Sequence, residues 1–243
     1  VPIGAWAGDA FGWKMVFGAT GGISACLLIV CHFLLPGMQI QGVALERKGE
    51  YIRRYLGFLR SRICAAGLFC SLFASAGTMG FLYFLGTWLH DAYGIPARRV
   101  GLVFLVAGSA AVLASPLAGS FADRIGKRLQ FLLSSVSLAV FLLILPHTSW
   151  GVPLFVVLGL LSLSAAFRQG PMEAVLTEIA GPASRGSFVA LKNSFSQLGI
   201  GAATLLSGML YETSGYAAVC LLGAGACLLA AVATYFTAHL VQS

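Results

Sequence analysis

Charged side chains are scarce in this chain, so those that interrupt its apolar stretches are the first candidates for chemistry. Asp, Glu, Lys and Arg make up 9% of the 243 residues. The segment GSFADRIGKR at 119–128 nevertheless concentrates Asp123, Arg124, Lys127 and Arg128 between two apolar runs. In such a turn, Asp123 can interact with the positive N-terminus of a neighbouring helix, and Arg124 can pair with an acid. Lys127 and Arg128 can hold the turn at the inner face of a membrane.

Arg168 is a second charged residue in apolar surroundings. The segment AAFRQGPMEA at 165–174 places it toward the end of an apolar run that begins at Val152. A charge at that depth is costly unless it is paired or faces a cavity, so Arg168 is a predicted substrate-binding residue. The alternative is an arginine with a buried stem whose guanidinium reaches water at the inner interface.

Gly170 and Pro171 lie two and three residues after Arg168. Because proline has no N–H to donate, this pair predicts a break in the helix, which could serve as the hinge of a gate. Glu173 and Glu178 come next and have no positioned histidine or nucleophile beside them. We expect these two acids to pair with Arg168 or Arg185.

Uncharged polar residues at helical spacing are further candidates for contact with a solute. Ser71, Ser75 and Thr78 share one helical face. Asn193, Ser196 and Gln197 share another, and Tyr83 and Phe167 could add aromatic walls. The alternative for these residues is hydrogen bonding between packed membrane helices, which is a common role of serine and threonine.

Known catalytic patterns are absent from the sequence. It contains no HExxH, no GxSxG and no phosphate-binding loop. Its histidines are far apart, and its six cysteines show neither CxxC nor Cys/His ligand spacing. We therefore predict no catalytic residues, no metal, no cofactor and no disulfide framework.

The composition favours a membrane protein. Hydrophobic residues make up 58% of the chain, and the mean hydropathy is +0.90. This leaves too little charge to cover a water-facing surface. The net charge of +7 could suggest a nucleic-acid partner, but the basic residues lie in short patches between long apolar runs. Such patches are typical of cytoplasmic loops, so we predict a lipid bilayer and no nucleic acid as partners.

Seven apolar runs are long enough to cross a bilayer as helices. They cover about 16–35, 63–90, 100–118, 129–146, 152–172, 188–210 and 216–240. If the loops alternate sides from an inner loop after the first run, most lysines and arginines fall inside, Lys192 among them. This bias predicts a multi-pass protein of the plasma (inner) membrane with a cytoplasmic C-terminus.

The longest polar segment, 37–62, mixes arginines with aromatic and aliphatic residues. Two interpretations remain open for it. It could be a solvated loop that joins two helix bundles, or it could lie on the inner membrane surface.

A short internal repeat bears on domain organisation. DAFGW at 9–13 resembles ETSGY at 212–216, and each lies between apolar runs. Parallel repeats are known from transporters, and in such a repeat about 140 or more residues would precede Val1. We therefore expect a fragment whose partner is the missing N-terminal half of the same polypeptide.

The segment 119–128 also carries a family resemblance. It is similar to the signature G-x-x-x-D-R-x-G-R/K-R/K of the major facilitator superfamily, which is matched by Gly119, Asp123, Arg124, Gly126, Lys127 and Arg128. The segment 4–17 resembles the end of helix 5 and the start of helix 6 of that family, and 184–216 resembles its loop 10–11 and helix 11.

This resemblance implies an all-α membrane bundle with seven of an expected twelve helices, about helices 6 to 12. It divides the chain into 1–36 (end of helix 5 and helix 6), a cytoplasmic central loop at 37–62, and a C-terminal six-helix half at 63–243. It also makes the signature turn a gating latch, in which Gly119 ends a helix and approaches its neighbour, and Gly126 permits the tight turn. RQG at 168–170 resembles a shortened form of the family's R-x-x-Q-G motif in helix 4.

The function implied is secondary active transport of a small solute by alternating access, with proton-coupled efflux of drug-like or amphipathic compounds as the main expectation. Uptake or exchange of an organic anion or sugar is the alternative, which Arg168 favours. Because no acid lies in the middle of an apolar run, the proton carrier is expected in the missing half. A candidate of another class is a membrane assembly module that transports nothing.

Overall fold

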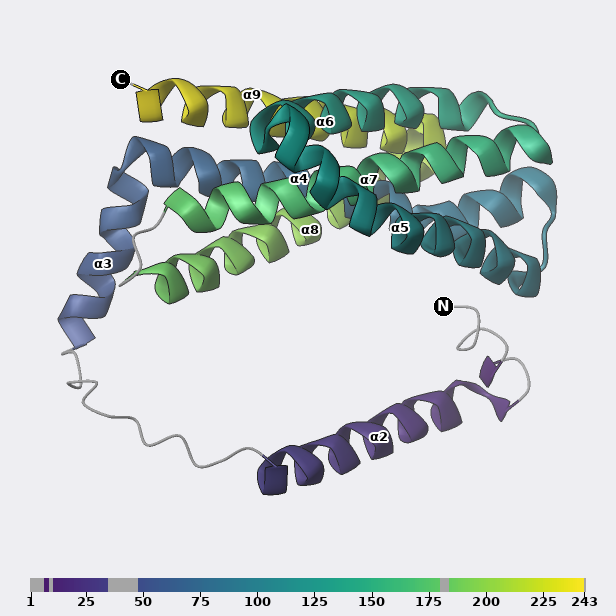
Figure 1. The fold of residues 1–243 in the computed structure, drawn as a ribbon. Helices are drawn as coiled ribbons and strands as arrows, with labels where there is room; N and C mark the ends of the chain where they lie inside the picture. The colour runs from purple at the N-terminus through teal and green to yellow at the C-terminus, as the bar shows by residue number, and fades with distance from the viewer. Residues whose placement is uncertain (1–6, 9–10, 35–47, 180–183, 243) are drawn as a thin grey trace.

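A computed structural model describes residues 7–8, 11–34, 48–179 and 184–242, and every regular element in these ranges is a helix. The helices are α2 (Trp13–Leu34), α3 (Lys48–Arg60), α4 (Arg62–Tyr93), α5 (Ala97–Ile125), α6 (Lys127–Ile144), the 3₁₀ turn η1 (Leu145–His147), α7 (Val152–Ile179), α8 (Arg185–Ser214) and α9 (Tyr216–Gln242). Figure 1 shows them along the chain. The predicted all-α class is confirmed.

Six of the described helices are long and apolar enough to cross a membrane, compared with the seven predicted. The difference is α8, which forms where a span was expected and is 30 residues long. Its N-terminal half carries Arg185, Lys192, Asn193 and Gln197, and these residues lower its mean hydropathy. The polar face of α8 therefore needs neighbours other than lipid.

Local signals set several helix ends. Ser61 caps the N-terminus of α4, and its hydroxyl accepts a hydrogen bond from the Cys64 N–H at 3.5 Å. Gly94 closes the same helix in the left-handed region, at φ +65°, with its N–H on the His90 carbonyl at 2.8 Å. Gly126 is the single residue between α5 and α6 and has φ +89°, so its predicted role in the tight turn is confirmed.

Two helix breaks predicted from glycine and proline do not occur. Gly119 lies inside α5, which continues to Ile125, and a Cβ atom at Gly119 would meet nothing within 4 Å. Pro171 lies inside α7, which runs without interruption through Gly170 to Ile179. The expected helix end at Gly119 and the expected helix break at Gly170–Pro171 were therefore wrong for this conformation.

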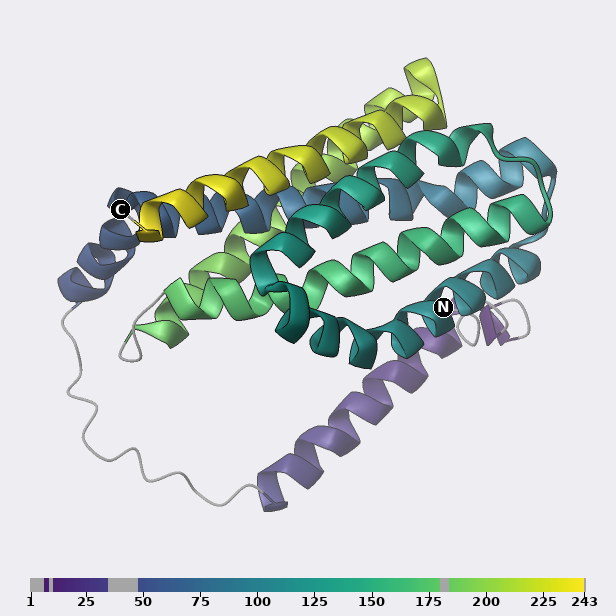
Figure 2. The same ribbon diagram turned by 45° about the horizontal axis from the view of Figure 1, so that its top comes forward.

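Helices α4 to α9 form one bundle, in which α4 packs on α9 and α8, and α7 packs on α5 and α6 (Figures 1 and 2). Two apolar clusters fill it. One is built around Leu89, Leu142 and Val219, and the other around Leu68, Phe131 and Phe188. Burying such side chains is worth about 1.5–3 kcal/mol each relative to water, although a bilayer reduces that gain.

Small residues let α4 approach its neighbours closely. Gly199 on α8 faces the backbone of Leu72, and Gly80 on α4 faces Ser207 and Ala203. Small residues at such contacts are typical of closely packed membrane helices. Gly18 and Gly22 make no such contact, because both residues are exposed on α2.

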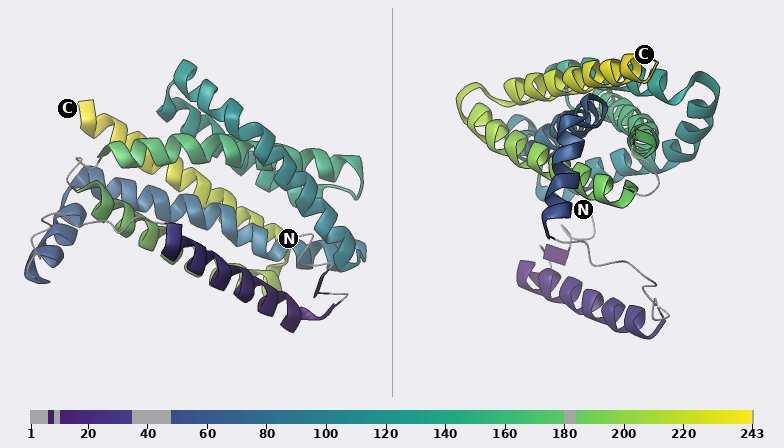
Figure 3. Two further views of the ribbon diagram at one scale, coloured as in Figure 1. Left: turned by 60° about the horizontal axis from the view of Figure 1, so that its bottom comes forward. Right: turned by 90° about the vertical axis from the view of Figure 1, so that its left-hand side faces the viewer.

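The N-terminal helix α2 lies apart from the bundle in Figure 1 and in the right-hand view of Figure 3, and it packs on no other helix in the described part of the chain. Helix α3 is short and crosses the end of the bundle near the C-terminus (Figures 1 and 3). It belongs to the central segment, whose residues 37–47, like part of the repeat at 9–13, lie outside the described residues.

Candidate functional site

A hollow of about 400 Å³ opens between α4, α7 and α8, and we call it the polar hollow. It is lined by Ala74, Ser75, Thr78 and Met79 of α4, by Gln169, Met172 and Glu173 of α7, and by Lys192, Asn193, Ser196, Gln197 and Ile200 of α8. The exposed amides of Gln169, Asn193 and Gln197 offer both hydrogen-bond donors and acceptors. The space therefore suits a solute with polar groups.

An ion pair forms part of the wall of the polar hollow. The Lys192 ammonium donates to both carboxylate oxygens of Glu173, at 2.5 and 2.6 Å. The Lys192 side chain is 5% exposed and the Glu173 side chain 40%. Glu173 was expected to pair with Arg168 or Arg185, and this was wrong. The Glu178 side chain lies outside the described part of the structure.

Arg168 lies behind this wall and not in it. The residue is 2% exposed, and its guanidinium donates to the Ala74 carbonyl at 2.7 Å, to the Thr78 hydroxyl, and to the Cys227 sulfur at 3.5 Å. Its Nε has no partner, and no carboxylate described in the structure forms an ion pair with it. The guanidinium thus joins α7 to α4 and α9. The alternative, in which it reaches water at the inner interface, does not fit a residue that is 2% exposed.

A second hollow, of about 230 Å³, lies between α4, α5 and α7, and we call it the apolar hollow. Its wall is almost entirely aliphatic or aromatic, and it includes Phe81, Leu85, Phe104 and Leu161. Thr78 lines both hollows. A single molecule with an apolar body and a polar end could therefore contact both hollows beside Thr78.

The other predicted contact residues divide between these places. Asn193 and Gln197 line the polar hollow. Tyr83 is 57% exposed on α4 and lines neither hollow. Phe167 lies against Phe121 of α5, with ring centroids 5.5 Å apart, and lines a separate groove between α5, α6 and α7. The structure thus brings two of the five predicted residues together.

The hydroxyl groups of α4 serve two purposes. Ser71 is buried, and its hydroxyl bonds the Ser196 hydroxyl at 2.5 Å and the Lys192 carbonyl at 3.4 Å. This is the packing role that was the alternative for these residues. Ser75 and Thr78, on the same face, line the polar hollow.

The signature turn lies at the junction of α5 and α6. Asp123 and Arg124 are exposed on the last turn of α5, while Lys127 and Arg128 are partly buried at the start of α6. An exposed carboxylate and guanidinium at this position are free to meet another part of a larger protein. The gating role of the turn stays a prediction.

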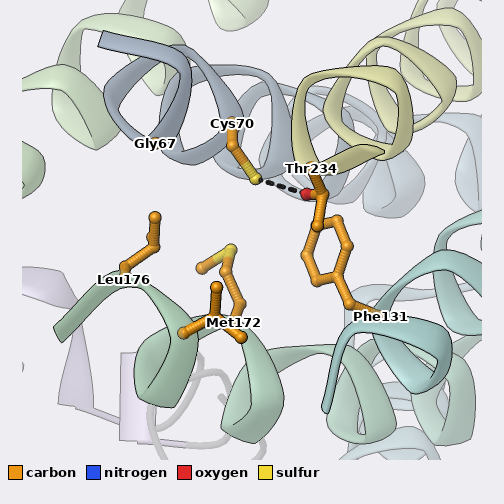
Figure 4. A pocket seen from close by; sticks show the side chains of 7 residues that line it. Gly67, Cys70, Phe131, Met172, Leu176 and Thr234 are labelled. Carbon is orange, nitrogen blue, oxygen red and sulfur yellow. Dashed lines mark hydrogen bonds between the residues drawn. The ribbon is translucent and has the colours of Figure 1, made fainter. Parts of the chain in front are cut away.

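A small cavity lies between α4, α6, α7 and α9 (Figure 4). Its volume is about 10 Å³, and the Cys70 sulfur and the Thr234 hydroxyl lie 3.1 Å apart in its wall. This is at most the room for one water molecule, so the cavity is a packing gap and not a binding site.

Three buried or half-buried polar residues were not recognised as important from the sequence. Glu173 was assigned to a structural pair, and Lys192 was counted with the inner loops although it lies about two turns inside α8. Gln130 is 2% exposed, and its amide N–H₂ donates to the carbonyls of Ala118 and Phe167, both at 2.9 Å. The available signal was a polar side chain inside an apolar run or directly after it. Gln130 and Lys192 lie inside the runs 129–146 and 188–210, and Glu173 follows the run 152–172.

An all-α bundle of long apolar helices around a polar hollow defines an integral, multi-pass membrane protein. Comparison with known families agrees, because the model of the Major Facilitator Superfamily matches residues 67–242, more than half of the chain. The chain belongs to the major facilitator superfamily. This membership agrees with the expectation that the protein is not an enzyme.

Individual relatives align with most of this chain. The uncharacterized MFS-type transporter YbcL of Bacillus subtilis is 26% identical over 96% of this chain, and the transcription regulatory protein OpdE of Pseudomonas aeruginosa is 28% identical over 98%. A probable sugar efflux transporter of Mannheimia succiniciproducens is 24% identical over 92% of the chain. The chain spans 58% of the length of each of the first two and 55% of the third.

Proposed function

We propose that the protein is a secondary active transporter that exports a small amphipathic, drug-like solute in exchange for protons. The observation that carries this proposal is the pair of hollows that meet at Thr78. The apolar hollow suits an aromatic or aliphatic body, and the polar hollow suits a head group. Relatives named as transporters and as a sugar efflux transporter support transport in general.

Alternating access is proposed for the whole protein, in which a second bundle would close the open side of both hollows. The signature turn is then the candidate latch between the two bundles, with exposed Asp123 and Arg124 as its contacts. Gly170 and Pro171 remain a candidate hinge, since proline leaves one carbonyl of α7 without its helical donor and so weakens that turn.

The proposed setting is the plasma (inner) membrane, with a cytoplasmic C-terminus. In support, α3, the end of α7, the start of α8 and the C-terminal helix end all lie at one end of the bundle (Figures 1 and 2). Arg53, Arg60 and Arg185, all exposed, lie on these elements. A cluster of basic residues at one end is typical of the cytoplasmic side.

The site of proton coupling was expected outside this chain. Glu173 is an additional candidate, because its carboxylate lies in the wall of the polar hollow, where a proton from water can reach it. An intramembrane acid that faces a cavity is a common element of proton-coupled transport.

A transport assay with graded solutes tests the proposal. The purified protein is reconstituted in liposomes with an imposed pH gradient, and the movement of 2-naphthoate, 2-naphthamide and glucose is followed. We expect gradient-driven movement of at least one naphthalene compound and none of glucose. The double variant Asn193→Ala/Gln197→Ala should reduce that movement, because it removes two amides of the polar hollow.

A second candidate is transport of a sugar or an organic anion. The three amides in the wall of the polar hollow favour it, since hydroxyl and carboxylate groups need such partners. Gradient-driven movement of glucose without either naphthalene compound would replace the amphipathic proposal by this one. Movement of no solute at all would favour the assembly module.

A further inference from the structure

The two partners of the Lys192–Glu173 ion pair are unequally accessible. The Lys192 side chain is 5% exposed and the Glu173 side chain 40%, although the two charged groups are in direct contact at 2.5 Å. The lysine is held between α8 and its neighbours, and its own carbonyl accepts a hydrogen bond from Ser71. Glu173 is therefore the partner that can leave, because its carboxylate already faces the polar hollow.

The charges near the polar hollow do not cancel. Arg168 lies one hydrogen bond behind the wall, on Ala74 and Thr78, which both line the hollow. The charged groups described on α4, α7 and α8 around the hollow are Arg168, Glu173 and Lys192, two cations and one anion. A second anion in the hollow would compensate the remaining positive charge, whereas a cation would add to it.

Groups that could receive the displaced carboxylate are present. Gln169, Asn193 and Gln197 are exposed in the hollow, and their amides can donate hydrogen bonds to carboxylate oxygens. Glu173 could thus move away from Lys192 without becoming an unsolvated charge. The ammonium it leaves would be a buried cation at the end of a hollow and open to a new anion.

We propose that Lys192 binds the anionic head group of the transported solute, and that Glu173 is a built-in competitor that occupies Lys192 while the site is empty. The solute class is then a monoanion with an apolar body, such as an aromatic carboxylate, with its body in the apolar hollow. This inference rests on the proposed function and narrows it. It does not depend on the direction of transport or on the coupling ion.

Equilibrium binding separates this inference from the transport proposal. The protein is placed in phosphatidylcholine nanodiscs at constant pH, and binding of radiolabelled 2-naphthoate and 2-naphthamide is measured. These compounds share one apolar body and differ in the charge of the head group. Glu173→Gln should tighten 2-naphthoate binding by about tenfold and leave 2-naphthamide unchanged, because the competing anion has been removed.

Changes at Lys192 test the other partner. Lys192→Gln should weaken 2-naphthoate binding by about tenfold or more, and Lys192→Arg should largely retain it. Glu212→Gln is the matched control for Glu173→Gln. It removes an exposed acid of α8, the helix that carries Lys192, far from the hollow, and should change the affinity for neither compound. If Lys192→Gln does not fold, Glu173→Gln and Lys192→Arg still decide the outcome.

The possible outcomes are distinct. Equal binding of both compounds, unaffected by Glu173→Gln, would overturn the inference and leave the amphipathic proposal in place. Weaker binding of 2-naphthoate by Glu173→Gln would also overturn the inference, since it would make the carboxylate part of the binding site. Binding of neither compound by any variant would overturn both the inference and the proposed solute class.

Discussion

The guanidinium of Arg168 on α7 donates a 2.7 Å hydrogen bond to the main-chain carbonyl of Ala74 on α4. The same carbonyl also accepts a hydrogen bond from the Thr78 hydroxyl at 2.8 Å. The Ala74 carbonyl thus has two side-chain donors in addition to its place in the helix. A membrane arginine without a carboxylate partner is unusual, and here neutral acceptors inside the bundle solvate it. This arrangement fixes α7 against α4 beside the polar hollow.

Replacement of Arg168 by alanine should destabilise the bundle and abolish transport. Hydrogen bonds made by a charged group contribute about 1.5–3 kcal/mol, so the melting temperature in detergent should fall by several degrees. Membrane insertion should be unaffected. Arg124→Ala, at an exposed position, is the control and should melt like the starting protein. Unchanged melting and transport of Arg168→Ala would show that the network has no role.

Gly199→Ala should separate α8 from α4. A Cβ atom at this position would overlap the backbone carbonyl of Leu72, which cannot move as a side chain would. Overpacking typically costs about 1–3 kcal/mol, and a clash with backbone should lie at the upper end. Gly201→Ala lies on the same helix with nothing within 4 Å and should be neutral or slightly stabilising. Equal melting temperatures of the two variants would contradict the close approach.

The two glycines of the signature turn should respond differently to alanine. Gly126 has φ +89°, which strains any residue with a side chain, so Gly126→Ala should cost about 1–2 kcal/mol. Gly119→Ala adds a methyl group in open space inside α5 and should stabilise the helix by about 0.5–1 kcal/mol. Thermal unfolding of both variants measures this difference. If Gly119→Ala melts normally but loses transport, Gly119 meets a partner outside the bundle.

Gln130→Leu should loosen the contact of α6 with α5 and α7. The variant keeps a similar volume and removes two hydrogen bonds. The Ala118 carbonyl keeps its helical donor in α5, but the Phe167 carbonyl does not, because the residue four positions on is Pro171, which has no N–H. A stability loss of about 1–3 kcal/mol is expected from the unsatisfied Phe167 carbonyl. Leu133→Met, an apolar exchange at an exposed position of α6, is the control and should melt like the starting protein. A melting temperature above that of the starting protein would refute this assignment.

The fold was largely predictable, because apolar runs about 20 residues long leave few alternatives to spanning helices. The errors arose where one residue type is compatible with two local structures. Pro171 predicts a break, but the turns on either side continue the helix because its lost hydrogen bond is one of many. Polar residues in α8 lowered its hydropathy, yet the helix forms because its polar face lies against the hollow and α4.

The candidate site was predictable only in part. The spacing of Asn193 and Gln197 placed both on one face, and they do line the polar hollow. The direction of Arg168 depends on how α7 is rotated against α4, which its own sequence does not determine. The pairing of Glu173 with Lys192 joins two helices across a loop, so no periodicity within one helix could have revealed it.

The one-residue link at Gly126 has a mechanical consequence. Residues of α5 such as Phe104 and Ala107 form part of the wall of the apolar hollow, and α5 ends only one residue before α6 begins. No slack exists between the two helices, so a tilt of α5 must pull the cationic first turn of α6 with it. If the proposed transport mechanism holds, a bulky guest that pushes α5 outward would therefore also displace the signature turn.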